Sequence, residues 1–353
     1  MESIYDVIGR IGAPDEAARS RAKARWDSLA KPLGSLGLLE DVLCSMAALR
    51  GSEALSLSRR RLLVFCADNG VVAQGVSQCG SEVTAKVAAA LAEGRSSVSP
   101  MARAVGCAVV PVDVGILDFP GHPGVLDRRV RGGTGDISRG PAMTRAECLR
   151  AMETGAALAK ACAEDGTGIL LVGEMGIGNS TTAAAVCAAL LGLTPEEAAG
   201  RGAGLSDAGL ARKREASERA LAVNTPDHAD PVDVLGKVGG LDLAAMCGAF
   251  LGAAACRTPV VIDGFISSAA ALCAVRLCAD ARHAMLASHC SAEPAAECVL
   301  AALGLSAPIR AGLRLGEGSG AVALLPMLDM ALALYNSGQS FEKLGIAAYV
   351  PQT

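Results

Sequence analysis

GEMGIGNSTTAAA, residues 173–185, follows directly on the apolar run Ile169–Val172 and continues into alanine-rich sequence. The aliphatic run has the composition of a buried strand, and the alanine-rich continuation predicts a helix. Glycines and several hydroxyl and amide side chains lie between the two. A strand, a glycine-rich turn and a helix in this order form one βα unit of an open, mainly parallel sheet. We therefore expect an α/β fold.

The same alternation recurs along the chain. Three further apolar runs, Leu62–Phe65, Ala108–Val114 and Pro259–Ile262, are each followed by glycine or polar residues and then by a helical pattern. Ligands of open parallel sheets bind beyond the carboxyl ends of the strands. The loops that follow the four apolar runs are therefore the first place to look for a functional site, and each of them places glycine beside a carboxylate.

Several helix boundaries are also marked in the sequence. Thr144–Glu147 and Thr194–Glu197 have the spacing of capping boxes, in which a threonine and a glutamate satisfy backbone amides at a helix start. Residues 15–50 have the pattern of two helices interrupted at Lys31–Gly34, and helical sequence returns after Gly320. We expect the terminal helices to pack together as a smaller unit over one edge of the sheet. The predicted division is a large α/β catalytic domain of residues 55–325 and a small helical domain formed by residues 1–54 and 326–353.

Composition narrows the class of partner. The 353 residues are 51% apolar and carry a net charge of −4 with both signs scattered along the chain, so we expect neither nucleic acid nor a membrane as a partner. The longest uncharged stretch, residues 175–195, opens with polar and glycine residues and does not have the pattern of a membrane span. The N-terminus lacks the pattern of a secretory signal, and we expect a cytoplasmic protein acting on small molecules.

The cysteines and histidines do not indicate a metal site. None of the 13 cysteines forms a C-x-x-C pair, and most of them lie singly in apolar segments, which is typical of buried free thiols. The four histidines do not have the spacing of zinc ligands. We expect no metal and no cofactor.

The glycine-rich turn itself suits an anion. Glycine permits close backbone approach, and the free amides and dipole at a helix start favour a phosphate. A simple helix cap, with Asn179 and Ser180 as capping residues, explains the stretch equally well. The turn lacks the lysine of a Walker loop, and its glycine spacing differs from G-x-G-x-x-G, which argues against dinucleotide binding.

Two other stretches contain candidate functional residues. Gly200-Arg-Gly-Ala-Gly204 precedes a charged helix from which Lys213 could reach a phosphate, although an exposed charged face is the simpler interpretation. Glu317 lies between two glycines before an apolar helix, where burial would raise its proton affinity and suit a general base. A carboxylate that binds free amides at a helix start is the alternative for Glu317.

Taken together, these segments resemble one family, the nicotinate-nucleotide:dimethylbenzimidazole phosphoribosyltransferases. The resemblance runs in order from about residue 30 to residue 330. The matching segments are Lys31–Gly37, residues 67–72, Val112–Gly115, Gly140–Thr144, residues 173–185, Gly200–Gly204, Val238–Gly240, Asp263–Ile266, Ser291–Pro294 and Arg314–Gly320.

The resemblance implies a reaction and a fold. Members of this family move 5-phosphoribosyl from nicotinate mononucleotide to a nitrogen of an aromatic base, with inversion at C1′, in building the nucleotide loop of cobamides. The pyridine leaving group departs neutral, so no general acid and no metal-chelated pyrophosphate is needed. The resemblance also implies a Rossmann-like large domain, a small helical domain from both termini, and a homodimer.

It further implies roles for particular residues. Glu317 would take the proton from the attacking base, and Glu174 would orient the ligand or balance positive charge on the ribosyl group. The division of roles between these two carboxylates stays open. The residues expected to bind the nucleotide and its phosphate are Gly176, Gly178, Asn179, Ser180, Gly202, Gly204, Lys213, Asp263, Gly264 and Ser291. The residues expected to line the aromatic-base pocket are Ser77, Ser81, Lys86, Met175 and Leu315.

The chain departs from the family pattern near that pocket. Asn69 stands where relatives usually have His, the loop Val76–Thr84 differs from the usual aromatic-Pro-Gln-Glu-Val-Thr, and Lys86 stands where Gln is common. We therefore expect relaxed or altered choice of base, with another benzimidazole, a purine or a phenol open as acceptors. A phenol-accepting homologue working with a second homologous subunit, and a non-catalytic nucleotide-binding regulator, are the competing hypotheses. A nicotinamide-dependent oxidoreductase is disfavoured by the missing glycine fingerprint.

Overall fold

A parallel sheet forms the centre of the protein. The computed structural model describes residues 2–350, and within them six strands lie in the order β3-β2-β1-β4-β5-β6. All neighbouring strands run parallel. The strands are β1 (Arg60–Ala67), β2 (Cys107–Gly115), β3 (Leu126–Asp127), β4 (Ile169–Met175), β5 (Val260–Ile262) and β6 (Met285–Ala287). The expected α/β fold with an open parallel sheet is confirmed, and the four predicted strands correspond to β1, β2, β4 and β5.

The order of the strands indicates where in the sheet a ligand site lies. The chain runs outward from β1 to β3 on one side and from β4 to β6 on the other, so the direction of winding reverses between β1 and β4. At such a switch point the loops after the two strands separate and leave a crevice at their carboxyl ends. The glycine-rich turn follows β4 at this position.

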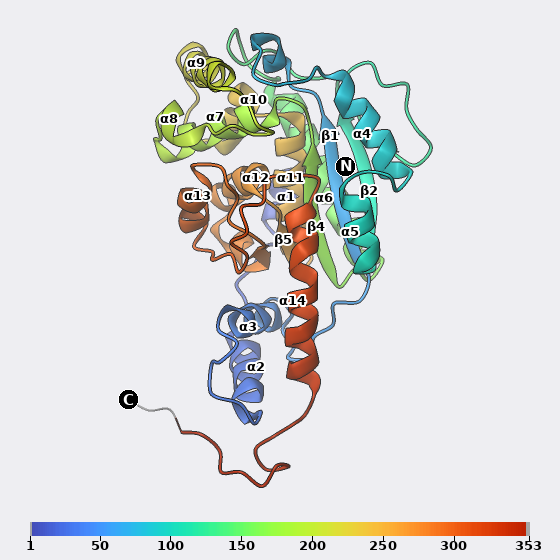
Figure 1. Cartoon of the computed structure of the whole chain (residues 1–353), viewed down its shortest axis with the longest axis vertical. Helices are drawn as coiled ribbons and strands as arrows, with labels where there is room; N and C mark the ends of the chain where they lie inside the picture. Colours follow the sequence, from blue (N-terminus) through green and yellow to red (C-terminus); the bar gives the residue numbers. More distant parts are fainter. Residues whose placement is uncertain (1, 351–353) are drawn as a thin grey trace.

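Helices cover both faces of the sheet (Figure 1). Alternate residues of β1 point to opposite faces: Leu63 and Phe65 belong to one apolar core, and Leu62 and Val64 belong to the other. The first core contains residues of α1 (Ile4–Ile8), α6 (Arg145–Glu164), α7 (Asn179–Leu191), α10 (Pro231–Val238), α11 (Leu241–Ala255), α12 (Phe265–Leu277) and α13 (Ala296–Leu303). The second contains residues of α2 (Glu16–Ser28), α3 (Leu38–Arg50), α4 (Glu82–Ala92), α5 (Val98–Ala104) and α14 (Ser319–Asn336).

Four further elements complete the described part of the chain. They are the 3₁₀ turns η1 (Gly70–Gln74) and η2 (Ala279–Ala284), the short helix α8 (Pro195–Ala198), and α9 (Asp207–Asn224). Both predicted capping boxes are present: Thr144 and Glu147 exchange hydrogen bonds at the start of α6, and Thr194 and Glu197 do so at α8. The predicted pair of N-terminal helices corresponds to α2 and α3.

Helices α6 and α11 cross at very short range because small residues lie where they meet. A Cβ atom added at Gly155 would lie 1.8 Å from the carbonyl oxygen of Ala245, and one added at Gly248 would lie 1.8 Å from that of Met152. Only glycine allows this approach. The close crossing brings α11 onto the sheet, and its first turn carries Asp242 to the end of β4.

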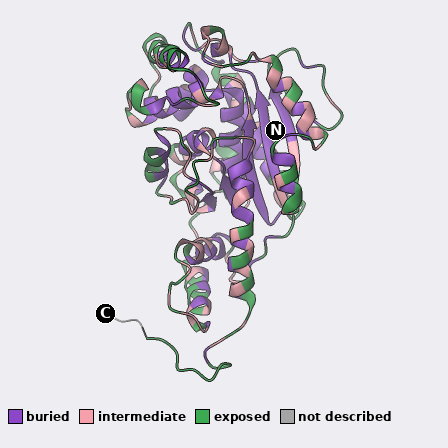
Figure 2. Ribbon diagram, viewed as in Figure 1, coloured by how far each residue is buried: buried purple, intermediate pink, exposed green. Residues whose placement is uncertain are grey.

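Helices α2 and α3, the end of α14 and the C-terminal segment lie together at one end of the molecule, whereas α1 packs against the first core (Figure 1). Trp26 of α2 packs against Tyr335 of α14 with ring centroids 5.2 Å apart, and Arg25 donates a hydrogen bond to Asn336. The predicted boundary at residues 325 and 326 falls inside α14, next to Pro326. The division of the chain into two domains stays a prediction. After the buried Phe341, residues 342–350 continue as an exposed tail (Figure 2).

Helix α14 is long and apolar enough to cross a membrane by length and composition alone. Half of it is buried within the protein, and Asp329 on the helix forms an ion pair with Arg60 of β1. Its apolar residues are accounted for by the second core, to which Val322, Leu325 and Leu328 belong.

Candidate active site

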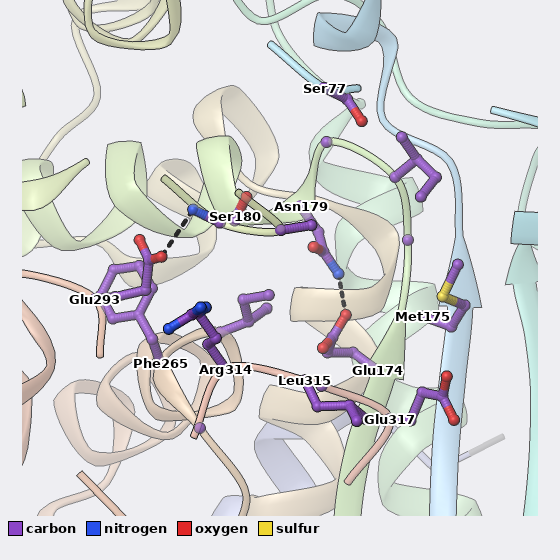
Figure 3. Close-up of a pocket in the computed structure, with 18 of the residues that line it drawn as sticks. Ser77, Glu174, Met175, Asn179, Ser180, Phe265, Glu293, Arg314, Leu315 and Glu317 are labelled. Carbon is purple, nitrogen blue, oxygen red and sulfur yellow. Dashed lines mark hydrogen bonds between the residues drawn. The ribbon is translucent and has the colours of Figure 1, made fainter. Parts of the chain in front are cut away.

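A cavity of about 360 Å³ opens at the switch point of the sheet. Its walls come from the end of β4, the turn 176–180, the loop 201–205, the start of α12, the loop 314–317, the loop 76–79 and one face of α4. Figure 3 shows Glu174, Met175, Leu315 and Glu317 at one end and Ser180, Phe265 and Glu293 at the other, with Arg314 between them. The cavity therefore has a carboxylate end and a second end formed around helix starts.

At the carboxylate end, Glu174 and Glu317 come from segments that pack directly on each other. A Cβ at Gly173 of β4 would lie 2.5 Å from the backbone nitrogen of Gly318, and one at Gly316 would lie 2.8 Å from Glu174 Oε1. Gly316, Glu317 and Gly318 have φ of +85°, +60° and +82°, in the left-handed region. A glutamate rarely adopts this conformation, and such strain is most often found at functional sites.

The carboxylate of Glu317 is held by a helix start distant in sequence. Its Oε2 accepts a 2.9 Å hydrogen bond from the backbone nitrogen of Val98, the first residue of α5. The side chain of Ser97 does not cap this helix, so Glu317 fills that position. No described residue donates to Oε1 of Glu317, which also lines the cavity. Glu317 therefore binds a helix start, as one of the two alternatives from the sequence expects, and it also lines the cavity. Its role as the general base stays a prediction.

Glu174 belongs to a buried carboxylate network. The amide of Asn179 donates to Glu174 Oε2 and, over 3.0 Å, to Asp242 Oδ2. Burial, with the nearby Asp242, Asp263 and Glu317 carboxylates adding to it, raises the pKa of Glu174 to about 8. Burial also raises the pKa of Asp242 to about 6. In the free protein at neutral pH, Glu174 is therefore mostly protonated and can donate a hydrogen bond.

At the other end, two helices begin with free amides facing the cavity. Gly178 precedes α7 with φ +92° and Gly264 precedes α12, and neither helix has a side-chain cap. Their first turns line the cavity together with Arg201 and Arg314. Uncapped helix starts combined with guanidinium groups favour an anion such as phosphate.

Lys213 lies just behind this end. It is fully buried, and its Nζ donates to Ser180 Oγ and to the Gly200 carbonyl, each over 3.0 Å. Burial lowers the pKa of Lys213 to about 8, while Glu293 acts in the opposite direction. Glu293 Oε1 also accepts a 2.8 Å hydrogen bond from the Gly202 backbone nitrogen (Figure 3). Glu293 thus holds the loop 201–205 against the cavity.

Asp263 lines the cavity and also holds the turn that precedes α14. Its Oδ1 accepts from Gly320 and Ala321, over 2.6 and 3.1 Å, and its Oδ2 accepts from Gly318 over 3.2 Å. The carboxylate therefore caps α14 and fixes the turn that carries Glu317. Burial raises its pKa to about 6.

Most of the predicted site residues line the one cavity. These are Glu174, Glu317, Gly176, Gly178, Asn179, Ser180, Gly202, Asp263, Gly264, Ser291, Ser77, Met175 and Leu315. Four others, Gly204, Lys213, Ser81 and Lys86, do not line it. Lys213 lies behind Ser180, Gly204 accepts a hydrogen bond from Gln78, and Ser81 precedes α4. Lys86 is exposed on α4.

Several residues of the site carried no predicted role. Arg201, Glu293 and Arg314 lie in the matching segments, so the clustering of those motifs was the available signal. His289 lines the cavity two residues before the segment Ser291–Pro294. Asp242 is recognisable only from the fold, because it follows no apolar run and reaches the site through the packing of α11.

The fold and the site together define an α/β enzyme class that binds a small anionic substrate beside a pair of carboxylates. The sequence model of the phosphoribosyltransferase family matches residues 11–346, nearly the whole chain. The chain belongs to this phosphoribosyltransferase family.

Individual relatives agree with this assignment. Nicotinate-nucleotide–dimethylbenzimidazole phosphoribosyltransferases from Ruminiclostridium cellulolyticum and Acetivibrio thermocellus are 44% and 41% identical to the chain, over 98% and 99% of both partners. The crystal structure of CobT from Thermus thermophilus superposes with a TM-score of 0.89 at 41% identity and covers 94% of this chain and 100% of that one.

Proposed function

We propose that this chain transfers 5-phosphoribosyl from nicotinate mononucleotide to a nitrogen of 5,6-dimethylbenzimidazole or a related aromatic base. The products are nicotinate and an α-ribazole 5′-phosphate, used in assembling the nucleotide loop of cobamides. The observation that carries the proposal is the meeting of Glu317 with the uncapped start of α7 in one cavity. The names of the relatives support the choice of substrates.

The nucleotide phosphate is assigned to the helix-start end of the cavity. The turn 176–180 and the uncapped start of α7 line this end of the cavity, with Lys213 behind Ser180 supplying positive charge. A phosphate dianion beside a buried ammonium favours the charged form of that lysine, which offsets the cost of burying it.

Replacing Lys213 tests this assignment. Lys213→Met is expected to weaken nucleotide binding about tenfold or more, the effect of losing one charged hydrogen-bonding group, whereas Lys160→Met, on the exposed face of α6, is not. Calorimetric titration with nicotinate mononucleotide measures both variants, and equal affinities would remove Lys213 from the site.

The reaction takes place at the carboxylate end. One nitrogen of the base attacks C1′ while the bond from C1′ to the pyridinium nitrogen breaks, and its electron pair returns to the neutral nicotinate ring. The N–H proton of the base passes to the carboxylate of Glu317. The hydrogen bond from Val98 keeps that carboxylate in position without occupying Oε1. Protonated Glu174 orients a ligand as a hydrogen-bond donor, which is the first of the two roles considered for it.

The acceptor base contacts Met175, Leu315 and the loop 76–79. Ser77, Gln78 and Cys79 line the cavity in a loop that departs from the family pattern, so relaxed or altered base choice stays our prediction. Lys86, which also departs from the family pattern, is exposed and does not line the cavity.

Base choice is tested by turnover with 5,6-dimethylbenzimidazole, benzimidazole, adenine and a phenol at equal nicotinate mononucleotide. The linkage of each product is identified by NMR. A strict preference for dimethylbenzimidazole contradicts altered base choice, and no nicotinate release with any base contradicts the proposed function.

We also propose a cytoplasmic homodimer. All 13 cysteines are free thiols, as suits a reducing compartment. Apolar side chains are exposed on the tail after α14, where Leu344, Ile346 and Tyr349 are each more than half exposed. A second copy that covers this tail would bury them.

A further inference from the structure

His289 has a fixed position on the wall of the cavity. It is 5% exposed, and its ring lies between two glycines. A Cβ at Gly320 would lie 2.0 Å from Nδ1, and one at Gly264 would lie 3.3 Å from Nε2. Its backbone is also tied down, because Cys290 donates a hydrogen bond to Ile309 and Ser288 accepts one from it. The ring is therefore held from both sides.

The hydrogen bonds around His289 determine which ring nitrogen carries the proton. The hydroxyl of Ser288 donates to the backbone carbonyl of Asp263 over 2.7 Å, so its single proton is used there. The 3.1 Å contact between Ser288 Oγ and His289 Nδ1 must then be donated by Nδ1–H. Burial lowers the pKa of His289, which keeps the ring neutral. Nε2 therefore carries a lone pair, and no described residue donates to it.

We propose that His289 Nε2 accepts a hydrogen bond from a ribose hydroxyl of the bound nucleotide. This inference rests on the proposed position of nicotinate mononucleotide in the cavity. An acceptor nitrogen cannot bind the phosphate or the nicotinate carboxylate, because both offer only acceptors at neutral pH. The N–H of the incoming base is directed to Glu317. The 2′- and 3′-hydroxyls are the remaining donors of the reactants.

The position of His289 suits this role. The ring adjoins Gly264 at the uncapped start of α12 and Gly320, three residues after Glu317. It thus lies between the phosphate end and the carboxylate end, where the sugar must lie. Asp263, whose carboxylate also adjoins Gly320, has both oxygens engaged by backbone amides of the segment 318–321.

Two substitutions separate ligand binding from a structural role. In His289→Asn the side-chain amide can replace the Nδ1–H bond to Ser288 but reaches no further, so only the Nε2 acceptor is lost. In His289→Gln an oxygen can take the place of Nε2, whereas the bond to Ser288 is lost. We expect His289→Asn to raise the KM for nicotinate mononucleotide about 3- to 10-fold, the effect of one neutral hydrogen bond, and His289→Gln to raise it less.

Deoxynucleotides identify the hydroxyl and complete the test. Wild type should lose affinity for either 2′-deoxy- or 3′-deoxy-nicotinate mononucleotide, and His289→Asn should show no further loss with that same analogue. The proposal would be overturned if KM rises more in His289→Gln than in His289→Asn. It would also be overturned if His289→Asn weakens binding of nicotinate mononucleotide and of both deoxy analogues to the same extent. Neither result contradicts the proposed position of the nucleotide, provided that Lys213→Met still weakens binding of nicotinate mononucleotide and of both deoxy analogues.

Nitrogen NMR of the wild-type chain tests the same inference without any substitution. The histidine spectrum should show His289 protonated at Nδ1 and unprotonated at Nε2, with the Nε2 signal moving when nicotinate mononucleotide is added. Protonation at Nε2, or a signal that is unchanged by a saturating amount of nucleotide, would refute the assignment even if both variants fail to fold.

Discussion

Glu317 combines an unfavourable backbone conformation with a fixed carboxylate. Its φ of +60° is tolerated because glycine precedes and follows it, and because Asp263 and Val98 hold the turn from two sides. A non-glycine residue in this conformation costs on the order of 1–3 kcal/mol. A glycine at this position would avoid the cost, so the presence of a glutamate is consistent with a catalytic role.

Replacing Glu317 tests its role as the base. Glu317→Gln should lower kcat at least about 100-fold, because an amide cannot take the proton, while the Kd for nicotinate mononucleotide changes little. Steady-state kinetics and calorimetry measure the two quantities. Glu297→Gln, an exposed glutamate paired with Arg310, is the matched control. Activity of Glu317→Gln close to that of wild type would rule out Glu317 as the base.

The raised pKa of Glu174 makes a prediction about stability and pH. The folded protein holds this proton up to about pH 8, whereas the unfolded chain releases it near the ordinary value of 4.5. The folded state therefore binds more protons between these values, and the contribution of Glu174 to stability falls as pH rises through that window. Glu174→Gln removes the cost of ionising the buried group.

Thermal unfolding at several pH values measures this effect. The Tm of Glu174→Gln relative to wild type should increase from about pH 5 to about pH 8 and level off above that value. A Tm difference that is the same at both ends of the range would show that Glu174 ionises normally in the folded protein.

Among the elements, the crossing of α6 and α11 depends on glycine. Gly155→Ala would place a methyl group 1.8 Å from the carbonyl of Ala245, so the helices must separate, at a cost of about 1–3 kcal/mol. Gly236→Ala in α10 is the matched control, since the nearest atom to its added Cβ lies 3.7 Å away. Urea unfolding of both variants compares them. Equal free energies of unfolding would contradict the importance of the close crossing.

The elements also show how far the sequence alone leads. Long aliphatic runs predicted β1, β2, β4 and β5 because each strand is buried on both faces. The edge strands β3 and β6 were not predicted, because β3 has only two residues, both exposed, and β6 contains no β-branched residue. Capping boxes located the starts of α6 and α8 because their signal is local.

The sequence indicated which residues line the cavity but not which contacts these residues make. Glycine beside carboxylate after each strand indicated the loops, and the resemblance indicated the residues. The hydrogen bond from Val98 to Glu317 spans 219 residues, and no local pattern encodes it. The same holds for Glu293, which reaches Gly202 across 91 residues, and for Asp263, which caps α14 across 57 residues.

At the scale of the whole molecule, the exposed tail is the feature that a second copy would explain. Ile346→Asp combined with Tyr349→Ser should shift the proposed dimer toward monomer, because polar groups replace apolar surface at the contact. Light scattering after gel filtration measures the mass. Leu126→Asp, an exposed apolar residue on the edge strand β3, is the control. A wild-type chain that is monomeric at micromolar concentration would contradict the proposed dimer.

The proposed mechanism depends on where the two reactants lie. A crystal structure of the chain with nicotinate mononucleotide and a non-reactive benzimidazole analogue measures this most directly. We predict the phosphate at the start of α7 and a ring nitrogen of the benzimidazole about 2.6–3.2 Å from the Glu317 carboxylate. A heterocycle bound outside hydrogen-bonding reach of Glu317, or a phosphate bound away from the turn 176–180, would contradict the proposed mechanism.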